Sequence, residues 1–335
     1  LAAIERANSG AAMPYGNDEI TRRLEQRIAN IFERSVAVFP VATGTASNAL
    51  ALSALTPPYG VIYCHEQSHI QADECGAPEL FTGGAKLLPL AGASGKVTPG
   101  ALAAALAQGW RGNVHNPQPA VLSLTQATEF GTIYRLDEIR ALAEIAHAHG
   151  LKVHMDGTRF ANALVSLNCA PADATWRAGV DVLSLGATKN GALAAESVIF
   201  FDPALAQTMA FRRKRGGHLF SKMRFVSAQL EAYLSDDLWL RNARQANAMA
   251  RKLADGLAKI HGCRLIHPRE ANLLFVMLPN RVIDGLEQAG FGFYREGGVR
   301  TIRLVTSYNT DPAAVDALVN AAKQLAAGAP VTMTA

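Results

Sequence analysis

The chain has few cysteines and no long apolar stretch. Its four cysteines, in 335 residues, are scattered without the Cys-x-x-Cys spacing of metal and redox sites. Reduced, structural thiols of this kind are typical of a cytoplasmic protein. No run of roughly eighteen or more apolar residues is present, so we expect no membrane span.

The sequence also lacks a strong charge of either sign. Its formal net charge is +4, and its basic residues are dispersed apart from the cluster Arg212–Arg215. This cluster is short and lacks interleaved aromatic residues, so we expect no nucleic-acid partner. It could instead contact an anion, lie at a subunit interface or simply be solvated. A hydrophobic content of 49% with 18% charged residues is typical of a globular enzyme.

Short β-branched or apolar runs alternate with helical periodicity along the first two thirds of the chain, which predicts an α/β fold with a mostly parallel sheet. A long helical pattern over residues 223–260, with a break near Asp236 and Asp237, then leads into a smaller α+β module. We therefore expect a large domain over residues 1–235 and a small C-terminal α+β domain over residues 236–335. The strands expected in the large domain are residues 35–41, 60–64, 120–124, 151–155, 180–185 and 197–201, and the helices are residues 19–34, 42–52, 98–106 and 136–149.

Asp156 and Lys189 each follow one of the predicted strands. Because the carboxyl ends of parallel strands meet at one edge of a sheet, the two side chains are expected where open α/β sheets place their chemistry. A carboxylate that holds a pyridinium proton and an amine that bonds to a carbonyl carbon are what pyridoxal phosphate (PLP) requires of its protein. The pair therefore predicts a PLP site.

Two further segments are candidates for the same site. Thr43, Gly44 and Thr45 precede a helix, whose free amides and dipole favour a phosphate, although an ordinary helix cap would need the same residues. His69 is expected in the loop after the strand at residues 60–64. There a flat imidazole could stack on an aromatic cofactor with help from Glu74, or simply be solvated.

The residues from His65 to His69 match the zinc pattern H-E-x-x-H. That pattern needs both histidines on one face of a helix, whereas here an apolar strand precedes it and a Cys-Gly-Ala-Pro segment soon follows. We expect a chance match and no metal, and a zinc hydrolase using His65 and His69 is kept as the alternative from a different class. Arg303 lies inside an apolar strand and requires an anion, either a substrate carboxylate or a structural Asp or Glu.

Several motifs occur together, in one order, along nearly the whole chain. They are Tyr15-Gly16-x-Asp18, Thr43-Gly44-Thr45-Ala46-x-Asn48, Ser68-His69-Ile70, His154-x-Asp156-Gly157-x-Arg159, the run from Ser184 to Gly191, and Arg303-x-Val305-Thr306. With these motifs the sequence resembles the threonine aldolases of the β-eliminating lyase group, and among these the low-specificity L-threonine aldolases of bacteria. That resemblance implies the aspartate-aminotransferase fold, which is fold type I of the PLP enzymes.

The resemblance also implies a role for each candidate residue. Some family members carry a histidine in the loop where Gln126 stands, and because Gln126 cannot be a base, His69 or a water would take that part. The implied roles are a covalent link to PLP for Lys189, a pairing with the pyridine nitrogen for Asp156, ring stacking for His69, phosphate binding for Thr43, Gly44 and Thr45, cofactor and substrate contacts for Arg159, and substrate contacts for Arg303, Tyr15 and Gln126.

The implied activity is the PLP-dependent retro-aldol cleavage of L-threonine, L-allo-threonine and other β-hydroxy-α-amino acids, with phenylserine among the candidates, to glycine and an aldehyde. The protein would then be an aldehyde-lyase. It would work in the cytoplasm as a homotetramer whose active sites share residues between subunits, with Tyr15 and Arg212–Arg215 as candidates. A PLP-dependent β-eliminating lyase is the main alternative, and a non-catalytic PLP-binding protein is a third.

Overall fold

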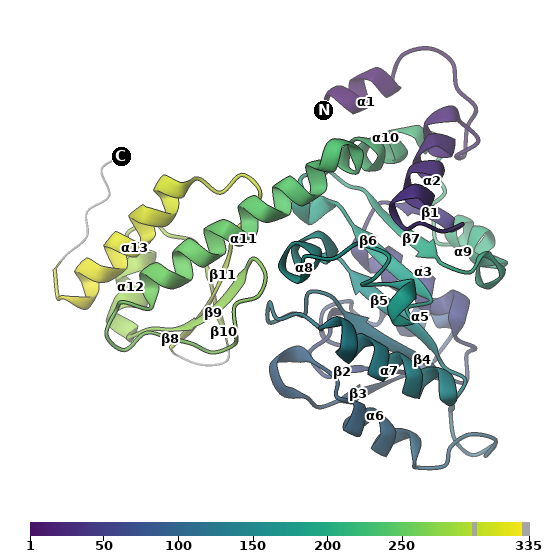
Figure 1. Ribbon diagram of the computed structural model, residues 1–335, viewed down its shortest axis with the longest axis horizontal. Coiled ribbons are helices and arrows are strands. Elements are labelled where there is room, and N and C mark those ends of the chain that lie inside the picture. The colour runs from purple at the N-terminus through teal and green to yellow at the C-terminus, as the bar shows by residue number, and fades with distance from the viewer. Residues whose placement is uncertain (297–299, 330–335) are drawn as a thin grey trace. The chain divides into compact units, whose positions relative to one another are not determined.

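The structure, a computed structural model, describes residues 1–296 and 300–329. The chain divides into two compact units (Figure 1). The first contains Leu1–Glu129 and Tyr134–Trp239, and the second contains Phe130–Ile133 and the chain from Leu240 onward. In the described ranges, no helix combines the length and apolarity needed to cross a membrane.

A seven-stranded sheet in the order β1-β7-β6-β5-β4-β2-β3 forms the centre of the first unit. All its strands run in one direction except β7, which is antiparallel to both of its neighbours. The mostly parallel sheet expected from the sequence is thus confirmed. The strands are β1 (Ala37–Val41), β2 (Gly60–His65), β3 (Lys86–Leu90), β4 (Gln118–Thr125), β5 (Lys152–Gly157), β6 (Val182–Gly186) and β7 (Glu196–Phe200).

The central strands are buried along their length. Every residue of β2, β6 and β7 is buried, so both faces of the sheet are covered, as in other parallel sheets. The helices of this unit are α1 (Ala2–Ala7), α2 (Glu19–Ile31), α3 (Gly44–Leu55), α4 (His69–Ala72), α5 (Ala77–Thr82), α6 (Pro99–Leu106), α7 (Leu136–Ala148), α8 (Phe160–Leu167), α9 (Met209–Arg215) and α10 (Arg224–Tyr233).

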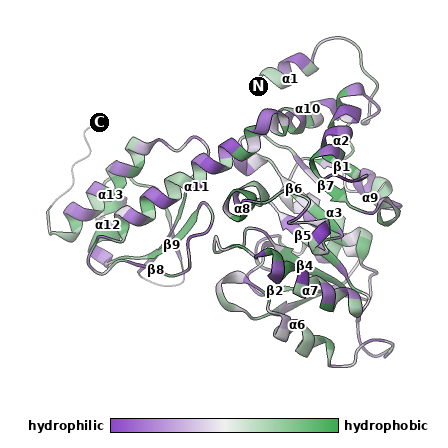
Figure 2. Cartoon of the chain, in the orientation of Figure 1, coloured by the Kyte–Doolittle hydropathy of each residue, from purple (hydrophilic) through white to green (hydrophobic). Residues whose placement is uncertain are grey.

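Helix α2 shows how the sequence sets these elements locally. Asp18 accepts a hydrogen bond from the Thr21 amide and so caps the helix. Leu24 and Ile28 are buried one turn apart, whereas Glu25 and Gln26 between them are exposed. In Figure 2, α2 and α11 accordingly alternate between hydrophilic and hydrophobic residues.

The second unit has its own antiparallel sheet in the order β10-β11-β9-β8. Its core contains fully buried residues from the helices and the sheet, among them Leu257, Val276, Ile283 and Ile302. The expected break between the two long helices is present, since Asp236 has a left-handed φ of 50°. The elements are α11 (Leu238–Leu257), whose first two residues belong to the first unit, β8 (Arg264–Leu265), β9 (Leu273–Met277), α12 (Asn280–Gln288), β10 (Tyr294–Glu296), β11 (Thr301–Val305) and α13 (Pro312–Ala326).

The segment Phe130–Ile133 contributes to the second unit from far away in the sequence. The carbonyl of Gly131 accepts hydrogen bonds from the amides of Glu270 and Ala271, at 3.2 and 2.9 Å. A side chain at Gly131 would lie 2.8 Å from the Leu273 side chain, and its φ is +76°. Only glycine fits this close approach.

Candidate active site

Three neighbouring parallel strands bring the candidate residues to one edge of the large sheet. In the register of β4, β5 and β6, Thr125 lies beside Asp156, and Asp156 lies beside Ser184. Lys189 follows β6 in the 3-10 turn Thr188–Asn190. The edge expected to carry Asp156 and Lys189 is therefore confirmed as their place in the fold.

Asp156 is a buried carboxylate whose oxygens both accept hydrogen bonds. Oδ1 accepts from the amide of Thr158 at 3.0 Å and from the Thr158 hydroxyl, and Oδ2 accepts from Asn48 Nδ2 at 2.9 Å. Burial by itself would raise the pKa of Asp156, but the bonds from Thr158 and the nearby charge of Lys189 outweigh it and hold the pKa below its usual value. Asp156 is thus kept ionised although only 2% of its surface is exposed.

A chain of hydrogen bonds extends from Asp156 to His69. Asn48 Nδ2 also donates to Glu74 Oε1 at 2.8 Å, and the same oxygen lies 2.9 Å from His69 Nδ1. The bond to Glu74 raises the pKa of His69, while burial raises the pKa of Glu74. Both shifts favour the protonated forms of the two groups. His69 begins the one-turn helix α4 and so does not lie in the loop expected from the sequence.

Lys189 sits on a turn that the protein holds from several sides. The buried carboxylate of Glu196 accepts hydrogen bonds from the amides of Ala187 and Thr188, at 3.1 and 3.3 Å. On the other side, Asn190 Nδ2 donates to the Tyr233 hydroxyl at 2.9 Å. These contacts fix the backbone on both sides of Lys189.

Burial favours the neutral form of Lys189, against the opposing effect of the nearby acidic groups. Burial, followed by the nearby charge of Arg159, lowers the pKa of Lys189. Burial also raises the pKa of Glu196 to about 7. A buried amine with a lowered pKa is unprotonated more often at neutral pH, which is the state a nucleophilic lysine needs.

The residues predicted to bind phosphate form the start of α3. The Thr43 hydroxyl accepts a hydrogen bond from the Ala46 amide at 3.2 Å, so Thr43 caps the helix. Gly44 and Thr45 are the first two residues of α3, where backbone amides have no acceptor within the helix. This helix end can accept an anion through the amides of Gly44 and Thr45.

Beneath Asp156, the fully buried His154 lies between two hydroxyl groups. Its Nδ1 is 2.9 Å from the Ser123 hydroxyl, and its Nε2 is 3.0 Å from the Ser184 hydroxyl. Burial lowers the pKa of His154 to about 4, so its ring is neutral near pH 7. The ring holds the middle of β5 against β4 and β6 next to Asp156.

The loop after β4 places Glu129, not Gln126, among these residues. Gln126 is fully buried, and both ends of its side-chain amide bond the backbone of Tyr134 at 2.9 Å. Glu129 interacts electrostatically with Asp156, His69 and Lys189, and burial raises its pKa. Glu129 was not among the residues predicted for the site. The sequence places a carboxyl group three residues after Gln126, but not the direction of its side chain.

Three other residues were predicted for the site, namely Arg159, Tyr15 and Arg303, and each has its own local environment. Arg159 precedes α8, is half-buried, and its charge acts on both Lys189 and Glu129. Tyr15 is 45% exposed, with Lys214 Nζ 4.9 Å from the centre of its ring. Arg303 lies in β11 of the second unit and is half-buried.

The histidines of the H-E-x-x-H match do not form a zinc-binding helical face. His65 is the last residue of β2, and its Nε2 lies 3.0 Å from the carbonyl of Gly92. His69 begins α4 and bonds Glu74. Among residues 1–296 and 300–329, no group of three or more His, Cys, Asp or Glu side chains is arranged to hold a metal ion.

Solved structures define the class of this fold. The threonine aldolase of Leishmania major is 28% identical to this chain and superposes with a TM-score of 0.90, over 97% of this chain and 95% of that one. Serine palmitoyltransferase from S. paucimobilis, solved with PLP and myriocin, is 14% identical and shares the fold with a TM-score of 0.70, over 98% of this chain and 83% of that one. The fold is fold type I of the PLP enzymes.

Sequence comparison narrows this class to a family. Residues 1–280 match the family described as β-eliminating lyase, and the chain belongs to that family. The low-specificity L-threonine aldolase of Pseudomonas sp. is 42% identical to it over 314 residues, which cover 94% of this chain and 90% of that protein.

Proposed function

We propose that this protein is a PLP-dependent aldehyde-lyase that cleaves L-threonine, L-allo-threonine and other β-hydroxy-α-amino acids to glycine and an aldehyde. Its similarity to low-specificity L-threonine aldolases supports the substrate class. The observation that carries the proposal is that a buried, ionised Asp156 and Lys189, whose pKa is lowered, lie at the same edge of the sheet.

The residues at this edge fit PLP by their chemistry. Asp156 would hold the ring nitrogen in its protonated form, and Lys189 would hold the cofactor covalently. The start of α3, at Gly44 and Thr45, would bind the phosphate through free amides, with Thr43 as the helix cap. His69 would stack on the ring in an orientation fixed by Glu74.

Bound PLP supplies an electron-accepting ring that takes up the electron pair released when the Cα–Cβ bond breaks. The protein's contribution is charge and position. Asp156 stays ionised because the hydrogen bonds from Thr158 and the charge of Lys189 lower its pKa, so it favours a protonated ring nitrogen and a stronger electron acceptor. Glu196 accepts hydrogen bonds from the amides of Ala187 and Thr188, and these bonds hold the backbone that carries Lys189 in one position.

Two arginines are assigned to the substrate carboxylate. Arg159 is half-buried beside Lys189, and a planar guanidinium can grip a carboxylate through two hydrogen bonds. Arg303 has no Asp or Glu partner within the described residues, which favours a substrate contact over a structural ion pair. A carboxylate held in this way orients the substrate's Cα–Cβ bond for cleavage.

Glu129 is assigned as the base that takes the proton of the substrate's β-hydroxyl group. Its carboxyl group is buried and its pKa is raised, which suits a group that must accept a proton near neutral pH. Gln126, expected among the substrate contacts, is reassigned to structure because its amide holds the backbone of Tyr134.

The remaining parts of the proposal concern the whole protein. We assign PLP binding to a domain over residues 1–235 and a supporting role to the domain over residues 236–335. We also propose a homotetramer in the cytoplasm, with Tyr15 at a shared active site. The four cysteines are all unpaired, which suits a reducing compartment.

Product analysis separates this activity from β-elimination. With L-threonine as substrate, the proposal predicts glycine and acetaldehyde in equal amounts. A 2-oxo acid and ammonia without glycine would instead identify a β-eliminating lyase. An inactive protein that still binds PLP would contradict both activities.

A further inference from the structure

A separate pocket of about 590 Å³ lies in the first unit, among α3, α5 and α9. Ser53 and Thr56 at the carboxyl-terminal end of α3 line it, whereas Gly44 and Thr45 lie at the opposite end of this helix. A twelve-residue helix is about 18 Å long. The pocket is therefore distinct from the proposed active site.

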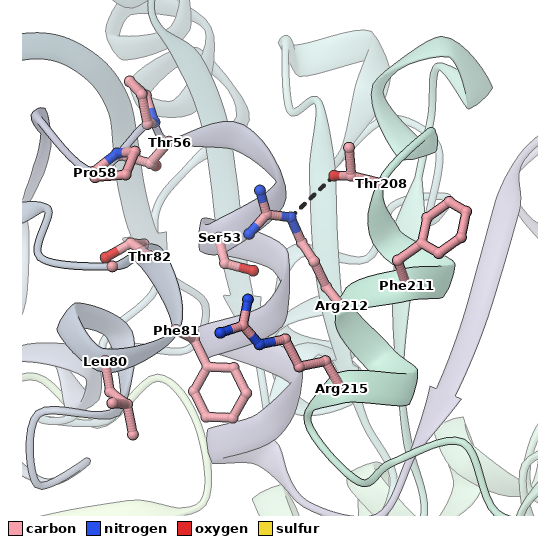
Figure 3. A pocket seen from close by; sticks show the side chains of 12 residues that line it. Ser53, Thr56, Pro58, Leu80, Phe81, Thr82, Thr208, Phe211, Arg212 and Arg215 are labelled. Atoms are coloured by element: carbon pink, nitrogen blue, oxygen red, sulfur yellow. Dashed lines mark hydrogen bonds between the residues drawn. The ribbon is translucent and has the colours of Figure 1, made fainter.

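Two arginines of α9 supply the charge of this pocket. Arg212 and Arg215 are three residues apart, so they lie on the same face of the helix, and Figure 3 shows both side chains extending toward α3 and Phe81. Arg212 Nε donates to the Thr208 hydroxyl at 3.0 Å, which fixes the side chain and leaves its terminal nitrogens for a ligand.

The charge of these arginines is not neutralised by the protein. Within residues 1–296 and 300–329, neither Arg212 nor Arg215 forms an ion pair with an Asp or Glu side chain. Burial, together with the neighbouring charge of Arg215, lowers the pKa of Arg212. A bound anion would relieve this repulsion.

The walls of the pocket add an apolar surface and one unpaired polar atom. Leu80 and Phe211 are 76% and 77% exposed, and Phe81 lies beside them in the lining. Thr56 is only 4% exposed, and its Oγ1 has no hydrogen-bond partner among the residues that the structure describes. Buried hydroxyl groups normally have a partner, so a residue of the pocket lining carries an unsatisfied hydrogen-bonding group.

We propose that this pocket binds a small organic anion, with its charged head between Arg212 and Arg215 and its apolar body against Phe81 and its neighbours. The volume lies within the range of small-molecule sites and is larger than an inorganic anion requires. Exposed apolar side chains beside a pair of arginines match a ligand that has an anionic head and an apolar body. This inference does not depend on the proposed reaction.

Calorimetric titration of the purified protein with phenyl phosphate tests the site, with inorganic phosphate as the comparison. We expect phenyl phosphate to bind more tightly. Arg212→Gln and Arg215→Gln should each weaken its binding about tenfold or more, and the double variant should abolish it. Arg140→Gln, which removes an exposed arginine of α7, is the matched control and should leave binding unchanged.

Each contrary result has a definite meaning. Binding that persists in the double variant would place the ligand elsewhere, for example at the start of α3, and would overturn the proposal. Equal affinity for phenyl phosphate and inorganic phosphate would overturn the assignment of an organic ligand. Retro-aldol activity, measured in the same samples, reports separately on the proposed reaction.

Discussion

Asn48 and Asp156 are joined by a hydrogen bond of 2.9 Å between Nδ2 and Oδ2, across a sequence separation of 108 residues. The same nitrogen donates to Glu74 at 2.8 Å. One amide group thus connects the carboxylate assigned to the ring nitrogen with the carboxylate that orients His69. Any change in Asn48 should therefore affect both the carboxylate assigned to the ring nitrogen and the histidine assigned to the ring face.

Asn48→Leu should lower kcat about ten- to a hundredfold while the protein stays folded. The substitution removes a hydrogen bond to a charged group, which contributes about 1.5–3 kcal/mol, and so weakens the hold on ionised Asp156. Steady-state kinetics with L-threonine, beside circular dichroism of both proteins, checks this. Normal turnover in a folded Asn48→Leu variant would show that Asp156 does not need its amide partner.

Glu129→Gln should reduce kcat by about two to four orders of magnitude, because the proposed base is lost. The raised pKa of Glu129 sets the sign of the pH dependence. In the unmodified enzyme, kcat should fall as the pH decreases through that pKa, since the base becomes protonated, and the variant should lack this limb. Gln126→Met is the matched control from the same loop, and it should retain the limb. A Glu129→Gln variant with an unchanged pH profile would move the base to His69 or to a water.

His154 should make the folded state less stable in mild acid. Its pKa falls from 6.5 to about 4 on folding, so between these pH values the unfolded chain binds a proton that the folded chain does not. The free energy of unfolding should therefore fall as the pH is lowered through this window, by about 3 kcal/mol at most. Urea unfolding at several pH values, compared between the protein and His154→Gln, isolates this contribution. If the free energy of unfolding changes with pH in the same way in both proteins, His154 makes no such contribution.

Arg303→Lys should raise KM for the amino acid about tenfold, with a smaller effect on kcat. Lysine keeps the positive charge but cannot grip a carboxylate through two parallel hydrogen bonds. Initial rates over a range of L-threonine concentrations measure the change. An unchanged KM together with a lowered melting temperature would assign Arg303 to the stability of the second unit.

The sequence predicted the residues at the edge of the sheet better than those in the loops. Asp156 and Lys189 were predictable because each follows an apolar strand, and parallel strands bring their ends together. Glu129 was not, because side-chain direction in the loop after β4 follows no period. The same limit applies to α4, α5, α8 and α9, which are short and were not predicted from helical periodicity.

Long-range contacts account for other differences. The segment Phe130–Ile133 belongs to the second unit because Gly131 bonds residues about 140 positions later, a pairing that local pattern does not encode. The residues of the basic cluster Arg212–Arg215 also differ in their contacts, which the sequence pattern does not encode. Arg213 turns inward, with its guanidinium 5.3 Å from the centre of the Phe39 ring, whereas Arg212 and Arg215 line the pocket.

The covalent anchor of the cofactor tests the central claim most directly. The protein would be loaded with PLP, reduced with borohydride, digested and analysed by mass spectrometry. The account predicts a PLP adduct on Lys189, together with loss of visible absorption on reduction, and no such adduct in Lys189→Ala, which should have almost no activity. An adduct on a different lysine, or an active Lys189→Ala variant, would contradict the assignment of Lys189 and with it the proposed site.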